Sequence, residues 1–147
     1  MGSTFFSLHH HIVFSTKERR PYIHSEWCPR LHSYLGGMIR GLSGVAEIVG
    51  GVEDHVHLLV SLRPVSCLAD VMRDLKKGSS NWVKDNLNRR FAWQEGYAAF
   101  TVSPHATDSV RKYIAGQESH HAKASFSDEL RDLLNRAGIA YDEKYLL

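Results

Sequence analysis

Hydrophobic and polar residues alternate in the heptapeptide DHVHLLV, which predicts a β-strand near the middle of the chain. Successive side chains of a strand point to opposite faces of a sheet. Val56, Leu58 and Val60 are therefore expected to pack into a core, while the imidazoles of His55 and His57 project together from the other face. The pattern predicts a rigid strand that presents two neighbouring histidines.

The same periodicities predict the other elements of the chain. We expect further strands over residues 5–16, 46–52 and 97–102, where β-branched and aromatic residues gather. We expect helices that begin after Ser25, after Ser66 and at Thr107 or Asp108, with a last amphipathic helix over residues 126–137. Gly78 lowers helix propensity in the middle of the second helix, so a kink or break can form there.

The order of these elements predicts the fold class. Strand, helix, strand, strand, helix and strand is the split β-α-β topology. It implies an α+β sandwich of the ferredoxin-like or RRM-like kind, with a central antiparallel sheet and helices mainly on one face. The opposite face is then open to ligands, and the two histidines are expected to project from it.

Composition limits the class of protein without identifying its activity. At 147 residues the chain is long enough for one domain with a substantial core, and 43% of its residues are hydrophobic. A net charge of +2 is too small to indicate a nucleic-acid-binding protein by itself. Cys28 and Cys67 lack metal-type spacing, and long apolar runs are missing from the sequence. We therefore expect a reduced cytoplasmic protein that does not contact membranes.

A second group of candidate residues lies near the C-terminal end. Tyr113 and Gln117 are four residues apart in a short helical segment, so a phenol and an amide share one helical face. Two imidazoles on a strand suit a divalent metal but need at least one further ligand. Taken alone, alternating histidines are more typical of ordinary hydrogen-bonded side chains, and a lone tyrosine more often packs. Together, these residues suggest cutting and rejoining of DNA through a tyrosine.

Basic residues form two groups that could contact phosphates. Their members are Lys17, Arg19 and Arg20 after the first strand, and Arg73, Lys76, Lys77 and Lys84 along the second helix. A basic helix stripe is otherwise a solvated face. Of the run His9-His10-His11, one or two side chains are expected to face the same surface as His55 and His57, whereas His120 and His121 are expected at the surface.

With these residues in view, the chain resembles the single-tyrosine HUH transposases of the smallest bacterial insertion sequences, the IS200-like superfamily, and their REP-associated relatives. The matching stretches, in order, are STKERRP from Ser15, DHVHLL from Asp54, LKKGSS from Leu75, WQEGY from Trp93 and the tyrosine helix. The resemblance implies a transposase domain over residues 1–125. Residues 126–147 are expected to form a helix and tail packed on that domain, with no functional role carried over.

The resemblance also implies a mechanism. His55, His57 and Gln117 would hold one divalent ion, Mg²⁺ or Mn²⁺, and Tyr113 would be the nucleophile. The enzyme would bind single-stranded DNA with hairpins, cleave it to a 5′-phosphotyrosine intermediate and rejoin strands. A homodimer is implied, and the protein would associate with the nucleoid when bound to DNA.

Two other functions are weighed against this one. Histidine-triad nucleotide hydrolases have His-x-His-x-His on a strand, but the third position here is Leu59, so the nucleophilic histidine would be missing. A domesticated relative that grips DNA hairpins without cutting them remains the main alternative.

Overall fold

The computed structural model describes residues 2–146. Met1 and Leu147, the first and last residues of the two predicted ranges 1–125 and 126–147, lie outside the described residues. The first six elements are β1 (His9–Ser15), α1 (Cys28–Gly41), β2 (Val45–Val52), β3 (His55–Ser61), α2 (Leu68–Asn86) and β4 (Ala98–Val102). They are followed by α3 (Thr107–Ala115), α4 (Gln117–His121) and α5 (Phe126–Arg136). A 3₁₀ turn, η1 (Lys17–Arg19), follows β1, and another, η2 (Glu143–Tyr145), follows α5. This order confirms the predicted α+β fold and its split β-α-β topology.

The four strands form one antiparallel sheet in the order β2-β3-β1-β4. The histidine strand β3 is therefore an inner strand, with β2 and β1 as its neighbours. In the register with β1, Ser15 pairs with His55 and Val13 pairs with His57. His11 pairs with Leu59, which places the His11 side chain on the same face as the two predicted ligands.

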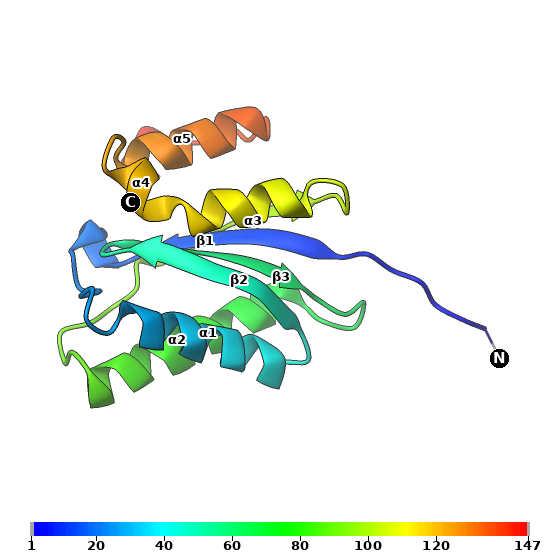
Figure 1. Cartoon of the computed structure of the whole chain (residues 1–147), viewed down its shortest axis with the longest axis horizontal. Coiled ribbons are helices and arrows are strands. Elements are labelled where there is room, and N and C mark those ends of the chain that lie inside the picture. The colour runs from blue at the N-terminus through cyan, green and yellow to red at the C-terminus, as the bar shows by residue number, and fades with distance from the viewer. Residues whose placement is uncertain (1, 147) are drawn as a thin grey trace.

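Helices cover both faces of the sheet (Figure 1). The long helices α1 and α2 lie on one face, and α3, α4 and α5 lie on the other. Our expectation of helices mainly on one face, with the second face open, was therefore wrong. The physical reason is a second small core, in which Ile114 of α3 packs against Leu59 and Val102. Within residues 2–146, none of the helices has the length and apolar character needed to cross a bilayer.

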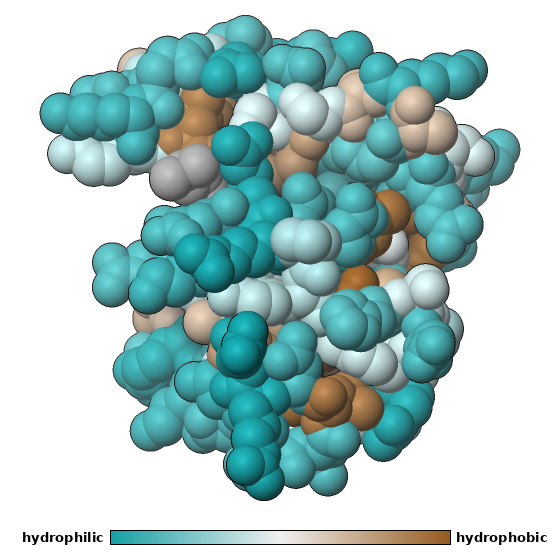
Figure 2. Space-filling view, turned by 90° about the vertical axis from the view of Figure 1, so that its left-hand side faces the viewer, coloured by the Kyte–Doolittle hydropathy of each residue, from teal (hydrophilic) through white to brown (hydrophobic). Residues whose placement is uncertain are grey.

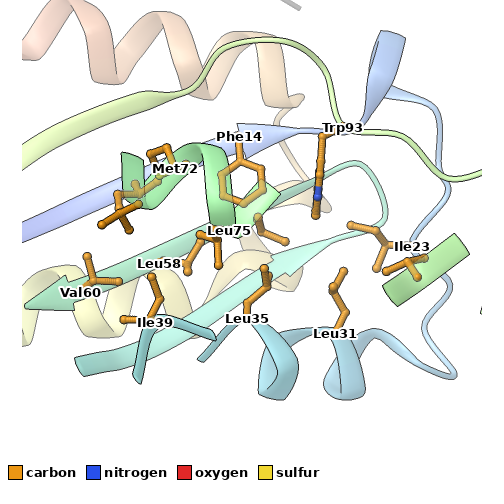
Figure 3. Packing of buried hydrophobic residues seen from close by; sticks show 14 of the residues in the cluster. Phe14, Ile23, Leu31, Leu35, Ile39, Leu58, Val60, Met72, Leu75 and Trp93 are labelled. Atoms are coloured by element: carbon orange, nitrogen blue, oxygen red, sulfur yellow. The ribbon is translucent and has the colours of Figure 1, made fainter. Parts of the chain in front are cut away.

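The main core lies between the sheet and the helices α1 and α2 (Figure 3). Val56, Leu58 and Val60 all point into it, as the alternation in β3 predicted. Its labelled members in the figure are Phe14, Ile23, Leu31, Leu35, Ile39, Leu58, Val60, Met72, Leu75 and Trp93. Burial of this apolar surface fixes which face of β3 turns inward, and so fixes the direction of both histidines.

Three predicted boundaries or irregularities differ from the structure. The first helix begins at Cys28 with Pro29 in its first turn, rather than directly after Ser25, because proline suits the start of a helix. The first strand begins at His9, four residues later than predicted. Helix α2 continues through Gly78, where an added Cβ would lie 2.4 Å from Cε of Met38. That glycine admits a neighbouring helix rather than ending its own.

A second glycine sets the position of the tyrosine helix. Helix α3 packs on β2, and a Cβ added at Gly50 would lie 2.6 Å from the carbonyl oxygen of Ile114. Contacts that short do not occur, so a larger residue at this position would move α3 away from the sheet. The close approach at Gly50 therefore fixes the depth at which the preceding side chain of the helix, Tyr113, meets the histidine face.

We predict that Gly50→Ala lowers the free energy of unfolding by about 1–3 kcal/mol, because the added methyl group overpacks the contact with Ile114. The control is Gly37→Ala in α1, where an added Cβ meets nothing within 4 Å. That variant should be as stable as wild type, or more stable by up to about 1 kcal/mol, because alanine favours helix. Urea unfolding measures both changes, and a Gly50→Ala protein of undiminished stability would contradict this packing.

Candidate active site

Both predicted histidine ligands lie in the interior, on the face of the sheet covered by α3, α4 and α5. His55 and His57 are each 0% exposed. Their Nε2 atoms lie 3.2 Å and 3.0 Å, respectively, from the same atom, Oε1 of Glu129 on α5. The structure therefore brings the pair together as predicted, but encloses it with a residue from the C-terminal segment.

Glu129 is the centre of the cluster. Its side chain is buried, and its second oxygen, Oε2, accepts hydrogen bonds from the Tyr113 hydroxyl and from Nε2 of Gln117 at 3.0 Å. Burial raises the pKa of Glu129, but the hydrogen bonds from His55 and His57 outweigh burial and hold the pKa well below its ordinary value. The carboxylate is therefore ionised at neutral pH and accepts hydrogen bonds with both oxygens.

Tyr113 and Gln117 meet at this carboxylate because the chain turns between them. Helix α3 ends at Ala115, the N–H of Gly116 donates to the Lys112 carbonyl, and α4 begins at Gln117. The predicted one-turn spacing thus brings the phenol and the amide to the same oxygen. Burial, followed by the contact with Glu129, raises the pKa of Tyr113. The phenol therefore remains protonated at neutral pH.

The ring of His55 is held on both nitrogens. Nδ1 donates to Oδ1 of Asp54 at 2.7 Å, and Nε2 donates to Oε1 of Gln117 at 3.0 Å. Phe126 stacks on the ring with centroids 4.3 Å apart. Burial lowers the pKa of His55, but the hydrogen bonds to Asp54 and Glu129 outweigh burial and raise it to about 9. The orientation of this imidazole is therefore fixed by one carboxylate outside the cluster.

His57 is held by the first strand. His57 donates from Nε2 to Glu129, so its Nδ1 accepts a hydrogen bond of 2.8 Å from Nε2 of His11. Burial lowers the pKa of His57, and burial followed by repulsion from His57 lowers the pKa of His11 to about 3. Both rings are therefore neutral. The expectation that a histidine of the His9–His11 run faces this surface is confirmed by His11.

His121 is a further member of the cluster, and our expectation of a surface position for it was wrong. Its side chain is 9% exposed, and Nε2 lies 3.0 Å from Oε1 of Glu129. His120 is more exposed, with Nε2 3.4 Å from Oε2 of Glu129. Ligand atoms of His55, His57, His121 and Glu129 all lie within 4.8 Å of one another. This group has the donor types and the spacing that could hold a metal ion.

The sequence contained one weak signal for Glu129. It follows Phe126 by three residues and precedes Leu133 by four, so it lies on the stripe of α5 that faces the protein. A carboxylate on a buried stripe requires partners. Those partners are on β3, α3 and α4, which only the tertiary structure places beside α5.

The first basic group lies beside the cluster, at the end of the molecule shown in Figure 2, where hydrophilic residues cover most of the surface. The N–H of Thr16 donates to the Asp54 carbonyl at 2.8 Å, which joins this turn to the start of the histidine strand. Lys17 is exposed, Arg20 pairs with Glu18 at 3.0 Å, and Arg19 donates to the Ser127 hydroxyl.

The second basic group lies on α2, across the sheet from the histidines. Lys76 donates from Nζ to the carbonyls of Gln94 and Gly96, each at 2.6 Å, and burial lowers its pKa. This lysine therefore ties a loop to the helix. Arg73 pairs with neighbouring aspartates on its own helix, while Lys77 and Lys84 are exposed. The structure does not bring this group together with the predicted metal ligands.

A cavity of about 300 Å³ opens next to the cluster, between β1, the segment before β4, α5 and the tail. Phe126 lines it and also stacks on His55, so the cavity adjoins the histidine face. Tyr97, Tyr141 and Tyr145 contribute further aromatic rings to its lining. Its walls are thus suited to flat apolar groups.

Comparisons with known proteins identify a family and relatives of this chain. The family described as "Transposase IS200 like" matches residues 4–117. ISDra2 transposase TnpA of Deinococcus radiodurans is 29% identical over 126 residues, which cover 80% of this chain and 87% of that protein.

Two solved structures share the architecture. A crystal structure of a chain assigned as a transposase from Deinococcus radiodurans aligns with a TM-score of 0.66 at 22% identity, covering 80% of this chain and 95% of that one. The structure of a REP-associated tyrosine transposase bound to a REP hairpin aligns with a TM-score of 0.62 at 13% identity, covering 87% and 79%. With a family match over most of its length, this chain belongs to the IS200-like transposase family.

Proposed function

We propose that the protein cleaves and rejoins single-stranded DNA, with Tyr113 as nucleophile and a 5′-phosphotyrosine intermediate. The observation that carries this proposal is that the Tyr113 hydroxyl and both imidazoles of β3 contact one carboxylate, Glu129. Tyr113 and side chains that could hold a metal thus meet within a single chain, which supports the proposal. A homodimer, which the resemblance implies, is not required to assemble this site.

The residues present fit a divalent ion such as Mg²⁺ or Mn²⁺. Two imidazoles, His55 and His57, and the amide oxygen of Gln117 offer mixed nitrogen and oxygen donors, and the Gln117 oxygen lies 3.0 Å from Nε2 of His55. A divalent ion held there would polarise the scissile phosphate and neutralise charge that develops on it.

The nucleophile already contacts an acceptor for its proton. A phenol has an ordinary pKa of about 10 and attacks phosphorus poorly while protonated. The hydrogen bond from Tyr113 to ionised Glu129 orients the hydroxyl, and the proton passes to this carboxylate as the bond to phosphorus forms, because the phenolic oxygen then becomes far more acidic. The new bond joins the phenolic oxygen to phosphorus and the bond to the 3′-oxygen breaks. Because the phosphodiester energy is kept, another 3′-hydroxyl can attack the phosphotyrosine and reseal the strand.

The proposed substrate is single-stranded DNA that carries a hairpin. One structural relative is bound to a REP hairpin, which supports the substrate class. The turn at Lys17 and Arg20 adjoins the start of β3 and offers cations to phosphates near the cleaved bond. The aromatic cavity beside Phe126 can accept a base by stacking. The alternative is a protein that binds hairpins without cutting them.

We predict a covalent adduct when the protein is incubated with a 3′-labelled single-stranded hairpin and Mn²⁺. The adduct should survive denaturing electrophoresis and disappear with chelator. Tyr113→Phe should lower its yield by at least about 10³-fold, because the attacking oxygen is gone, while hairpin binding persists.

Tyr34→Phe is the matched control for this experiment. Tyr34 stacks on Trp82 with centroids 4.3 Å apart, on the side of the sheet away from the cluster, so its adduct yield should stay within about 2-fold of wild type. A shift in DNA mobility with no adduct in the wild-type protein would support the binding-only alternative instead.

A second prediction concerns which basic group contacts DNA. Hairpin binding weakens as salt rises, and the slope of log K against log salt measures this dependence. Lys17→Ala combined with Arg20→Ala should make the negative slope shallower by about 1.4. That value follows from the loss of about two single-strand phosphate contacts. Lys77→Ala combined with Lys84→Ala, which removes two exposed cations across the sheet, should leave the slope unchanged. The reverse result would show that DNA contacts the α2 face of the protein instead.

A further inference from the structure

Three imidazoles, of which those of His55 and His57 are fully buried and that of His121 is partly buried, present the same nitrogen to one point. Nε2 of His55, His57 and His121 lie 3.2, 3.0 and 3.0 Å from Oε1 of Glu129. The separations match those between neighbouring ligands of a small cation, since bonds of about 2.1 Å place adjacent ligands about 3.0–3.4 Å apart. An ordinary hydrogen-bonded cluster would satisfy these distances too, so the distances alone do not decide its role.

The contacts of the Nδ1 atoms, on the outer side of each ring, favour a metal site over an ordinary hydrogen-bonded cluster. Nδ1 of His55 donates to Asp54, and Nδ1 of His121 donates to the Ala124 carbonyl at 2.7 Å. Nδ1 of His57 is held by His11 at 2.8 Å. Each ring is thus anchored through Nδ1 by a group outside the cluster, which leaves Nε2 to face inward. His55 and His121, which donate from Nδ1 to an oxygen, have the usual environment of a metal-ligating histidine. His57 would take on the same environment by donating from Nδ1 to His11 when its Nε2 binds an ion.

We infer that His121 and Glu129 are further ligands of the metal that His55, His57 and Gln117 hold, so that three imidazoles, a carboxylate and an amide oxygen face the ion. Both added ligands lie beyond residue 117, where the match to the transposase family ends. The inference rests on the proposed function only for the presence of a metal at the histidine pair. It adds ligands from α4 and α5 that the His55, His57 and Gln117 set does not contain.

This ligand set has two consequences. Three imidazoles favour later first-row ions such as Co²⁺ and Zn²⁺ over Mg²⁺, which prefers oxygen ligands. Glu129 also has separate contacts for its two oxygens, with Oε1 toward the imidazoles and Oε2 toward the Tyr113 hydroxyl. One side chain from α5 therefore links the metal ligands to the nucleophile, and a bound ion should hold α5 against the tyrosine helix.

Metal binding to the full chain tests this inference without any DNA. Chelator-treated protein is titrated with CoCl₂, and affinity is measured by calorimetry and by the visible spectrum of the ion. Glu129→Gln and His121→Asn should each weaken Co²⁺ binding at least about 10-fold. The controls are Glu143→Gln and His105→Asn, exposed residues of the same types, which should stay within about 2-fold of wild type. Circular dichroism establishes that each variant is folded.

A measurement on wild-type protein avoids dependence on folding of the variants. Pulsed EPR of bound Mn²⁺ counts the coupled imidazole nitrogens, and we expect three. A count of two, or Co²⁺ affinity that is unchanged by both Glu129→Gln and His121→Asn, would overturn the inference. The adduct assay separates this result from the proposed function. A count of three imidazole nitrogens without a DNA adduct would contradict only the proposed cleavage. A DNA adduct with a count of two imidazole nitrogens would contradict only the added ligands.

Discussion

A carboxylate withdrawn from water is destabilised by several kcal/mol unless other groups replace its hydration. Glu129 is 3% exposed, and its two oxygens accept contacts from imidazoles, a phenol and an amide that lie on β3, α3 and α4. These three elements and α5 can therefore pack together only in an arrangement that satisfies this one side chain. The same requirement brings the Tyr113 hydroxyl into contact with the carboxylate that the imidazoles of His55 and His57 also contact.

The sheet supplies the rigid reference for this arrangement. Hydrophobic burial of Val56 and Leu58 on one face of β3 directs His55 and His57 to the other. The close approach of α3 at Gly50 then sets how far Tyr113 lies from these two rings. The centroid of the Tyr113 ring is 5.6 Å from the centroid of the His57 ring. Core packing, rather than a flexible loop, thus determines the spacing between Tyr113 and the two histidines. The likeness to transposases extends over this sheet and helix, and the C-terminal segment adds a carboxylate to them.

Local patterns were sufficient for the parts of the fold that depend on neighbouring residues. The alternation in β3, the order of strands and helices along the chain and the closeness of Tyr113 to Gln117 were predicted, and the structure has all three. Features that depend on residues distant in the sequence were not predicted. His121 and Glu129 join the cluster only because α4 and α5 fold back over the sheet, and Gly78 continues its helix only because Met38 of α1 fills the space beside it. A sequence shows that a residue is polar or small, but not which remote side chain it meets.

We propose that the phenolic oxygen of Tyr113 becomes bonded to DNA. Tryptic digestion of the adduct releases the peptide of residues 113–123, in which Tyr113 is the sole tyrosine. Tandem mass spectrometry of this peptide locates the attached nucleotide. We expect a 5′-phosphonucleotide on the Tyr113 side chain. A nucleotide on Ser119 of the same peptide, or on any other peptide of the chain, would contradict it.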